Sequence, residues 1–573
     1  MTAFPTLGTP PSDPVHPALL ITGDRARWRQ ITGRRQGLVL LAAMAGFGLI
    51  ILRLMQLGLA VPDTTIEGRT RDMIQASRPD IVDRNGIVMA VDISVPSLFA
   101  EPRRISDVPD TVDKLRTVLP DLDRNWLLGR LSGNSGFVWI RRELTPALKE
   151  RIMGLGLPGI DFINENRRFY PGGAEASHVI GTVDIDNRGT AGVELALDRE
   201  YVEVLHDVGL ARGQSLEPVE LSIDMRVQHV MRQELVTAIA RFRAIAGAGV
   251  MIDVRTGEVV ALVSLPDFDP NVPASALEKD ALNRITAGSY ELGSTFKTVT
   301  IAAALDGGSL AIDDLVDARE GVRFGRFVLD HGKHRILSVP EIFRFSDNIG
   351  TIRIMQAMGK EAYRRFLSRA GFDTRSPIEL PERAMPSVPA QFSDVGAATA
   401  SYGYGFAATP LHMASAIAAL ANSGMAVPPT IFARTAEEAS ALAVPIVSPQ
   451  TSREIRYLLR LNAVEGSGRR MERIATGFHA GGKTGTAEKV VNGQYSKTLN
   501  LTVFAAVFPI EEPRFALLVM LDEAKAETET GSREAGWNTA EVAGKIIQRT
   551  APMLGLVPQF DARDAAALTL LYP

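Results

Sequence analysis

The hydrophobic pattern of the chain changes near residue 221, where apolar strand-like runs begin. Two strand-like runs flank the turn Arg255-Thr256-Gly257 within residues 248–265, and a second strand pair covers 501–508 and 515–521. Between these pairs the pattern has helical periodicity, with a clear helix start at Thr409-Pro410, where a capping residue precedes proline in the first turn. Strands at both ends of a segment and helices between them predict an antiparallel sheet flanked by helices.

The region before this segment has a different pattern. Residues 66–220 alternate short strand-like runs with Gly, Pro and Asp breaks, and Asp83-Arg84-Asn85-Gly86 predicts a tight hairpin turn. Residues 167–173 and 189–194 are expected to be loop and packing elements, and no catalytic set is visible here. We therefore predict an extended β-rich, non-catalytic pedestal over 62–220, a catalytic domain over 221–555 and a tail over 556–573, an α+β multidomain chain.

The most apolar run lies near the N-terminus. Residues 37–61 are apolar or small except at a few positions and are long enough to cross a ~30 Å hydrocarbon core as a helix. Five arginines precede this run, whereas Asp63 and Glu67 follow it before any basic residue. The positive-inside rule then predicts a cytoplasmic tail over 1–36, a single transmembrane helix over 37–61, and a periplasmic remainder anchored in the inner membrane.

Two features of this run allow alternatives. A cleaved signal peptide would need a basic region of 36 residues, and no clear Ala-x-Ala site follows, so an anchor is favoured. Arg53 is costly inside a membrane. It either extends to the headgroups or, together with Gln56, faces the transmembrane helix of a partner.

Composition removes several classes of function. With 573 residues there is room for two or three domains, and a net charge of −4 does not indicate nucleic acid binding. The chain has no cysteine, which excludes thiol catalysis, disulfides and Cys-type metal sites. The eight histidines are scattered without ligand spacing. We predict neither a metal nor a cofactor.

Three short strings carry the candidate chemistry. They are Ser294-Thr295-Phe296-Lys297, Ser346-Asp347-Asn348 and Lys483-Thr484-Gly485-Thr486. Each string is weak by itself, and Ser132-Gly133-Asn134 is a second Ser-x-Asn match that we expect to be a loop. Ser-x-x-Lys, however, occurs once in the chain. Its uniqueness and the order of the three strings make a common site the favoured interpretation.

The first string combines a nucleophile with a base. Gly293 precedes Ser294 and an Ala-rich helical pattern follows, so the serine is predicted at a helix N-terminus with Lys297 on the same face. The helix dipole, a second lysine nearby and partial burial are expected to lower the pKa of Lys297 enough for it to take the serine proton. An ordinary N-cap serine beside a solvated lysine is the alternative for this string alone.

The other two strings supply proton transfer and substrate binding. Ser346 offers a hydroxyl that passes a proton toward a leaving amine, and Asn348 an amide that binds a peptide backbone. Lys483 attracts a carboxylate, the hydroxyls of Thr484 and Thr486 donate to it, and Gly485 permits close backbone approach. In isolation the second string would be a helix cap, with Asp347 structural, and the third a β-turn.

The amino-acid sequence around the three strings resembles that of the class B penicillin-binding proteins. The resemblance covers most of the chain beyond residue 37 and is carried by these segments: Arg78–Ala90, Arg168–Glu194, Tyr290–Lys297, Tyr402–Gly405, Thr409–Leu411 and Gly482–Ala487. It implies a serine β-lactamase-like catalytic fold and a peptidoglycan D,D-transpeptidase, in which Ser294 attacks the penultimate D-Ala carbonyl of a stem peptide. The backbone N–H groups of Ser294 and Thr486 would form the oxyanion hole, and β-lactams would acylate the same serine.

Within this family the chain is most similar to the division-specific (FtsI-type) enzymes. The indications are the modest pedestal, the wording Tyr-Glu-Leu-Gly-Ser-Thr-Phe-Lys and the Ala535-Gly536-Trp537-Asn538 segment before a final helix. This resemblance implies cross-linking of septal cell wall and partners among divisome membrane proteins, including an FtsW-type glycosyltransferase. Residues 66–220 are too short for a glycosyltransferase domain, so a bifunctional class A enzyme is not favoured.

Three other functions stay open from the sequence. An elongation-specific class B transpeptidase would share the same strings. A class A β-lactamase would need a carboxylate poised over the acyl-enzyme, and the stretch 378–383 offers no convincing one. A membrane-anchored divisome scaffold or β-lactam sensor would not need turnover, but the intact Ser294, Lys297 and Lys483 argue against it.

Overall fold

The computed structural model describes residues 44–51, 78–199, 216–325, 327–330 and 335–560. The chain forms two units, residues 1–74 and 75–573. In the first unit residues 44–51 are helical and exposed. None of the helices in the described ranges combines the length and apolar character that a membrane crossing needs. The predicted tail, the rest of the predicted membrane helix with Arg53 and Gln56, and residues 561–573 lie outside the described residues.

The N-terminal part of the second unit is built on a long β-ribbon. Strand β2 pairs antiparallel with β4 along most of its length and with β1 and β3 at its two ends, and β7 pairs parallel with β1. The strands are β1 (Ile81–Val82), β2 (Val88–Ala100), β3 (Val138–Arg141), β4 (Ile160–Phe169) and β7 (Val219–Glu220). The predicted turn at 83–86 joins β1 to β2, with the positive φ of 77° at Gly86.

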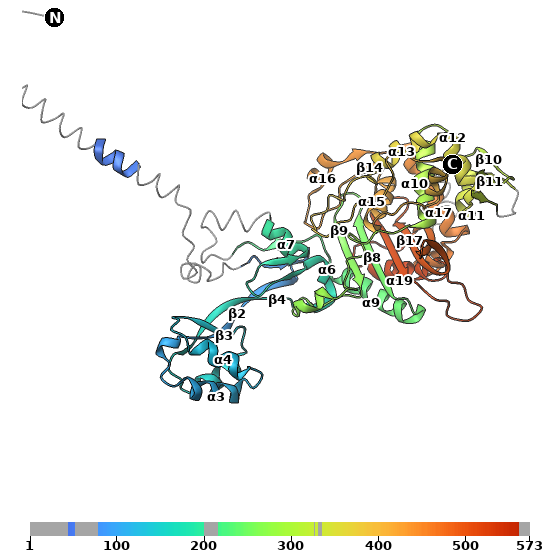
Figure 1. The fold of residues 1–573 in the computed structure, drawn as a ribbon. Helices are drawn as coiled ribbons and strands as arrows, with labels where there is room; N and C mark the ends of the chain where they lie inside the picture. The colour runs from blue at the N-terminus through green and yellow to red at the C-terminus, as the bar shows by residue number, and fades with distance from the viewer. Residues whose placement is uncertain (1–43, 52–77, 200–215, 326, 331–334, 561–573) are drawn as a thin grey trace, which may run out of the picture. The chain divides into compact units, whose positions relative to one another are not determined.

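This region is less uniformly β than its sequence indicates. Three helices pack beside β3 and the far end of β2 around their own small apolar core (Figure 1). They are α3 (Val108–Val118), α4 (Arg124–Leu131) and α5 (Pro146–Met153). Asp107, Asp123 and Thr145 cap them by accepting the backbone N–H three residues on. Ser132-Gly133-Asn134 lies in the bend after α4, as predicted.

A buried ion network joins the segments that follow. Glu194, on the short helix α7 (Gly192–Leu197), is fully buried and accepts from Arg78 Nε at 2.9 Å and Arg168 Nε at 2.6 Å. Arg168 also pairs with Asp92 at 3.1 Å. Arg78 pairs with Asp198 as well, at 2.5 Å. Two guanidinium groups and three carboxylates thus compensate one another where single buried charges would be unfavourable.

The catalytic part contains a five-stranded antiparallel sheet in the order β16-β17-β18-β8-β9. Its strands are β8 (Ala246–Asp253), β9 (Val259–Leu265), β16 (Gly481–Val491), β17 (Gln494–Phe508) and β18 (Phe515–Asp522). The two predicted strand pairs are therefore confirmed and lie side by side, with β18 against β8. The string 483–486 lies in the edge strand β16 and not in a turn.

Side chains of the sheet alternate between two cores, as the period of two requires. On β17, Val503, Ala505 and Val507 join the larger core, and Phe504 and Ala506 join the smaller one. Helices α9 (Met225–Phe242) and α19 (Thr539–Thr550) cover the smaller core (Figure 1). The larger core is covered by α10 (Phe296–Asp306), α12 (Asn348–Met358), α15 (Pro410–Ala421) and α17 (Pro449–Glu465). The predicted sheet flanked by helices is thus present.

Several helix boundaries follow their predicted caps. Helix α15 begins after Thr409, whose hydroxyl accepts from His412 N, and α10 covers the predicted Ala-rich segment. The segment that follows the second string forms two helices, α12 and α13 (Lys360–Arg369). They are separated at Gly359, which adopts φ 85°.

Candidate active site

Ser294 sits in a 3-10 turn (Gly293–Thr295) that leads directly into α10. The side chain is half-buried, and the predicted position at a helix N-terminus is confirmed. Gly293 adopts φ 54°, and a Cβ there would lie 2.8 Å from the Thr486 carbonyl oxygen. A Cβ on Gly403 would come within 2.0 Å of the Gly293 carbonyl oxygen. The backbones at Gly293, Gly403 and Thr486 therefore pack against one another without side chains between them. The serine turn lies directly on β16 as a result.

Lys297 lies one helical turn after Ser294 and is fully buried. Its Nζ donates hydrogen bonds to the Ser346 carbonyl oxygen at 2.5 Å, to Ser346 Oγ at 3.1 Å and to Asn348 Oδ1 at 2.6 Å. The first and second strings, predicted to share one site, are thus in direct contact.

Ser346 owes its position to an unusual backbone conformation. It ends α11 (Val339–Phe345) in the left-handed region at φ 55°, and Asp347 caps the next helix by accepting from Gly350 N at 2.8 Å. The structural role predicted for Asp347 is therefore confirmed. The sharp turn between the two helices brings both Ser346 and Asn348 into contact with Lys297. The left-handed conformation of Ser346 that makes this turn has an energetic cost of order 1–2 kcal/mol for an L-residue.

Lys483, on β16, also contacts Ser346. It is fully buried, and its Nζ donates to Ser346 Oγ at 3.0 Å and to the Thr484 carbonyl oxygen at 3.1 Å. The ring of Phe343 lies 5.7 Å from the amine. Burial lowers the pKa of Lys483 to about 7, so its charge is sensitive to pH near neutrality.

The outer edge of β16 presents alternate backbone groups to the site. The carbonyl oxygens of Gly482 and Thr486 accept from side chains on that edge, Asn462 Nδ2 at 2.7 Å and Tyr404 Oη at 3.2 Å. Because N–H and C=O of one strand residue point the same way, Thr486 N–H also points away from β17, toward the serine turn. Gly485 packs on that turn, since a Cβ there would lie 2.4 Å from the Leu292 carbonyl oxygen.

The structure adds residues that the sequence did not indicate. Asn462 on α17 is fully buried, holds Gly482 through its Nδ2, and accepts from Ser467 N and Oγ at 3.2 and 3.3 Å. Ser467 Oγ in turn lies 2.6 Å from Thr484 Oγ1. The Thr486 hydroxyl accepts from Ala535 N at 3.2 Å. No motif marks Asn462 or Ser467, because both act through the tertiary position of α17 against β16.

All eight predicted site residues therefore lie around one point. Ser294 is one turn from Lys297, Lys297 and Lys483 share Ser346, Asn348 accepts from Lys297, and Thr484 to Thr486 form the adjoining strand. In the described parts of the chain, no cluster of three or more His, Asp or Glu side chains is arranged to hold a metal ion. The arrangement offers a nucleophile, two buried amines, a shared hydroxyl and outward N–H groups, which suits acyl transfer.

Comparisons with known proteins agree with this geometry. Residues 247–548 match the family model of the penicillin binding protein transpeptidase domain, and residues 73–201 match that of the penicillin-binding protein dimerisation domain. A protein of Caulobacter vibrioides named probable peptidoglycan D,D-transpeptidase FtsI is 35% identical, over 84% of this chain and 82% of the relative. Peptidoglycan D,D-transpeptidase FtsI of Escherichia coli K12 is 29% identical, over 85% of this chain and 86% of the relative.

Solved structures support the fold. Penicillin binding protein 3 of Mycobacterium tuberculosis, complexed with aztreonam, superimposes with a TM-score of 0.64 at 23% identity, covering 84% of this chain and 97% of the other. A peptidoglycan synthetase of Bifidobacterium adolescentis gives a TM-score of 0.65 at 20% identity, covering 85% and 97%. With the family matches to both domains, this likeness places the chain in a known group. The chain belongs to the class B penicillin-binding proteins, in the group whose members include FtsI.

Proposed function

We propose that this chain is a peptidoglycan D,D-transpeptidase that cross-links stem peptides through a serine acyl-enzyme and is a target of β-lactams. The observation that carries the proposal is the convergence of Lys297 and Lys483 on the hydroxyl of Ser346, one helical turn from Ser294. Two buried amines bridged by a hydroxyl can move a proton between a nucleophile and a leaving amine without solvent. The names of the relatives support the same reaction.

In the acylation step, Ser294 Oγ attacks the carbonyl carbon of the penultimate D-Ala, and Lys297 Nζ accepts the hydroxyl proton. The oxyanion of the tetrahedral intermediate is stabilised by the N–H groups of Ser294 and Thr486. The C–N bond to the last D-Ala then breaks, and its nitrogen takes a proton through Ser346, which both lysines contact. An ester on Ser294 and a free D-Ala result.

In the second step, an amine of a neighbouring stem peptide attacks the ester. Its proton passes back along the same groups to Ser294 Oγ, a new amide bond forms, and the serine is regenerated. The incoming amine occupies the position that the leaving amine vacated, because the same groups serve both directions.

The binding roles follow from charge and hydrogen-bonding groups. Lys483, with the hydroxyls of Thr484 and Thr486, is assigned to the terminal carboxylate of the donor peptide or of a β-lactam. Asn348 accepts from Lys297 through Oδ1, and its Nδ2 remains to donate to a substrate carbonyl. Gly485 lets β16 lie directly on the serine turn.

The proposal also includes the cellular setting of the chain. The arginine-flanked apolar run supports a membrane anchor over 37–61, a cytoplasmic segment over 1–36, a pedestal over 62–220 and a catalytic domain over 221–555 in the periplasm. The FtsI names of two relatives support the transpeptidase activity. The FtsI-type resemblance of the sequence extends the proposal to septal cell-wall synthesis at the inner membrane, with an FtsW-type glycosyltransferase among the partners.

A labelling experiment tests the core of the proposal. The full-length chain is incubated with a fluorescent penicillin and the adduct is followed for an hour, for wild type, Ser294→Ala and the control Ser309→Ala after α10. We expect a stable adduct on wild type and Ser309→Ala and none on Ser294→Ala. An adduct that vanishes within minutes would indicate a β-lactamase, and absence of labelling in wild type would remove the acyltransferase proposal.

A further inference from the structure

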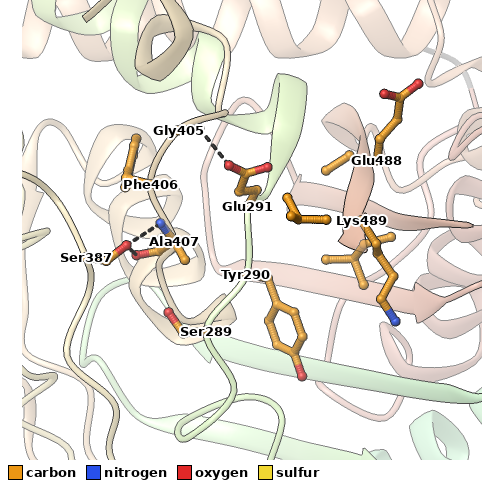
Figure 2. Close-up of a pocket in the computed structure, with 12 residues that line it drawn as sticks. Ser289, Tyr290, Glu291, Ser387, Gly405, Phe406, Ala407, Glu488 and Lys489 are labelled. Carbon is orange, nitrogen blue, oxygen red and sulfur yellow. Dashed lines mark hydrogen bonds between the residues drawn. The ribbon is translucent and has the colours of Figure 1, made fainter. Parts of the chain in front are cut away.

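A cavity of about 430 Å³ opens beside the end of β16, next to the segment that leads to the nucleophile (Figure 2). Its lining includes Tyr290, Glu291, Phe406, Glu488, Val490 and Leu501. Glu291 lies three residues before Ser294, and Glu488 two residues beyond Thr486. The cavity is therefore adjacent to the reaction site but contains none of the residues assigned to the chemistry.

Glu291 is held in place by one oxygen only. Its Oε1 accepts from Gly405 N at 2.7 Å and from Tyr495 Oη at 3.0 Å. Its Oε2 has no hydrogen-bond partner among the residues that the structure describes, and Figure 2 shows the carboxylate among the lining side chains. Burial raises the pKa of Glu291, because the loss of water outweighs the two hydrogen bonds that its Oε1 accepts.

The basic residue in the cavity lining does not neutralise this carboxylate. Lys489 lines the cavity, but its Nζ pairs with Asp522 at 3.0 Å and Glu523 at 2.7 Å. The exposed Glu488 adds a second negative charge to the lining. An oriented carboxylate with one open oxygen, in a half-enclosed acidic cavity, is suited to an ammonium group.

The direction of the donor peptide brings it to this cavity. With its terminal carboxylate at Lys483 and its scissile carbonyl at Thr486, the peptide runs antiparallel to β16, and the preceding residue reaches Glu488 about 7 Å further on. There the strand edge is already filled, because Tyr404 Oη donates to Thr486 O and accepts from Glu488 N, both at 3.2 Å. The donor has to leave the strand edge at this point, beside the cavity.

The chemistry of cross-linking implies that the donor peptide has a free amine upstream of its penultimate D-Ala. The acceptor is an amine on a second, identical stem peptide, so each donor carries the same amine, unused. Because the penultimate D-Ala offers no side-chain amine, this amine belongs to a residue further upstream. At neutral pH such an amine is an ammonium ion and needs a compensating charge when it leaves water.

We propose that the cavity binds the donor's own unused ammonium group, with Glu291 as its counter-ion. The inference rests on the proposed transpeptidase function and deepens it. The site thereby selects donor peptides whose diamino-acid side chain is still free, and rejects those in which that amine has already been acylated by an earlier cross-link.

Two synthetic stem peptides ending in D-Ala-D-Ala test this selection. In one, the residue before D-Ala-D-Ala carries a free side-chain amine, and in the other the same amine is acetylated. The kcat/KM of D-Ala release is compared for full-length wild type, Glu291→Gln and the control Glu512→Gln. Glu512 is an exposed carboxylate in the β17–β18 turn. Glu291→Gln keeps an oxygen for Gly405 N while removing the charge.

We expect wild type and Glu512→Gln to prefer the free amine by about tenfold or more, as one charge-assisted hydrogen bond allows, and Glu291→Gln to treat both peptides equally. Discrimination that persists in Glu291→Gln, or equal rates in wild type, would overturn the inference. Penicillin labelling of the same samples separates the two proposals. A wild type that is labelled but does not discriminate contradicts only the ammonium site, whereas a wild type without labelling contradicts the transpeptidase function.

Discussion

Lys483 Nζ donates a 3.0 Å hydrogen bond to Ser346 Oγ across a sequence separation of 137 residues. The same oxygen accepts from Lys297 Nζ at 3.1 Å. The hydroxyl therefore lies between a lysine on the helix of the nucleophile and a lysine on the edge strand. The residues proposed for proton transfer and for carboxylate binding, which lie in separate strings of the sequence, therefore contact the same oxygen atom.

Removal of that hydroxyl should impair acylation without unfolding the protein. We expect Ser346→Ala to lower the second-order rate of penicillin acylation by about 10²-fold or more, because both amines lose their shared partner. Ser132→Ala, in the other Ser-x-Asn string, is the matched control and should acylate like wild type. Stopped-flow labelling measures the rates, and a wild-type rate in Ser346→Ala would exclude the proton path through this oxygen.

The pH dependence of acylation should report Lys483. Burial lowers the pKa of Lys483 to about 7, so the amine is charged below that pH and neutral above it. Attraction of a β-lactam carboxylate requires the charged form, and acylation should therefore fall as the pH rises through this value. A profile from pH 6 to 9 for wild type and Lys483→Gln checks this. The falling limb should be missing in the variant, and its persistence there would assign it to another group.

The support of β16 by α17 should affect substrate binding more than chemistry. Ser467→Ala removes the partner of Thr484 Oγ1, and we expect a several-fold higher KM with little change in kcat. Asn462→Ala leaves Gly482 O without its side-chain donor and should lower the free energy of unfolding by about 1–3 kcal/mol. Ser467→Thr keeps a hydroxyl and should restore the KM. Equal KM values for Ser467→Ala and wild type would remove the positioning role.

The glycine contacts behind the nucleophile should not tolerate a side chain. In Gly403→Ala the new Cβ would meet Gly293 O at 2.0 Å, so the serine turn has to move. We expect lower thermal stability and a strongly reduced acylation rate. Gly371→Ala is a matched control, because Gly371 has a similar φ of 84° but no atom within 4 Å of the added Cβ. It should cost about 1–2 kcal/mol and acylate normally. Equal behaviour of the two variants would contradict the packing argument.

The buried carboxylate of Glu194 should be essential for the stability of its region. Glu194→Gln leaves Arg78 and Arg168 with less compensation, and we expect a loss of about 3–5 kcal/mol in the free energy of unfolding. Urea unfolding measures the change, with the exposed Glu437→Gln as control. A loss below about 1 kcal/mol, as for the control, would mean that the network contributes little.

The sequence by itself determined the features that depend on neighbours along the chain. The apolar strand pairs in 248–265 and 501–521 and the Thr409 cap depend on local sequence and hydrogen bonding, and the structure confirms them. The position of Ser294 at a helix N-terminus is equally local. The roles assigned to the eight site residues remain predictions, although the structure brings these residues together.

Only the tertiary structure decided which distant groups meet. Sheet order and helix packing determine three such contacts. They are the hydrogen bond from Lys483 to Ser346, the hydrogen bond from Asn462 to β16 and the hydrogen bond from Gly405 that orients the Glu291 carboxylate. The helices α3 to α5 were not anticipated, because short amphipathic segments take their conformation from the core that they cover. Contacts between residues more than a hundred positions apart leave no periodic trace in the sequence, and the packed core alone determines them.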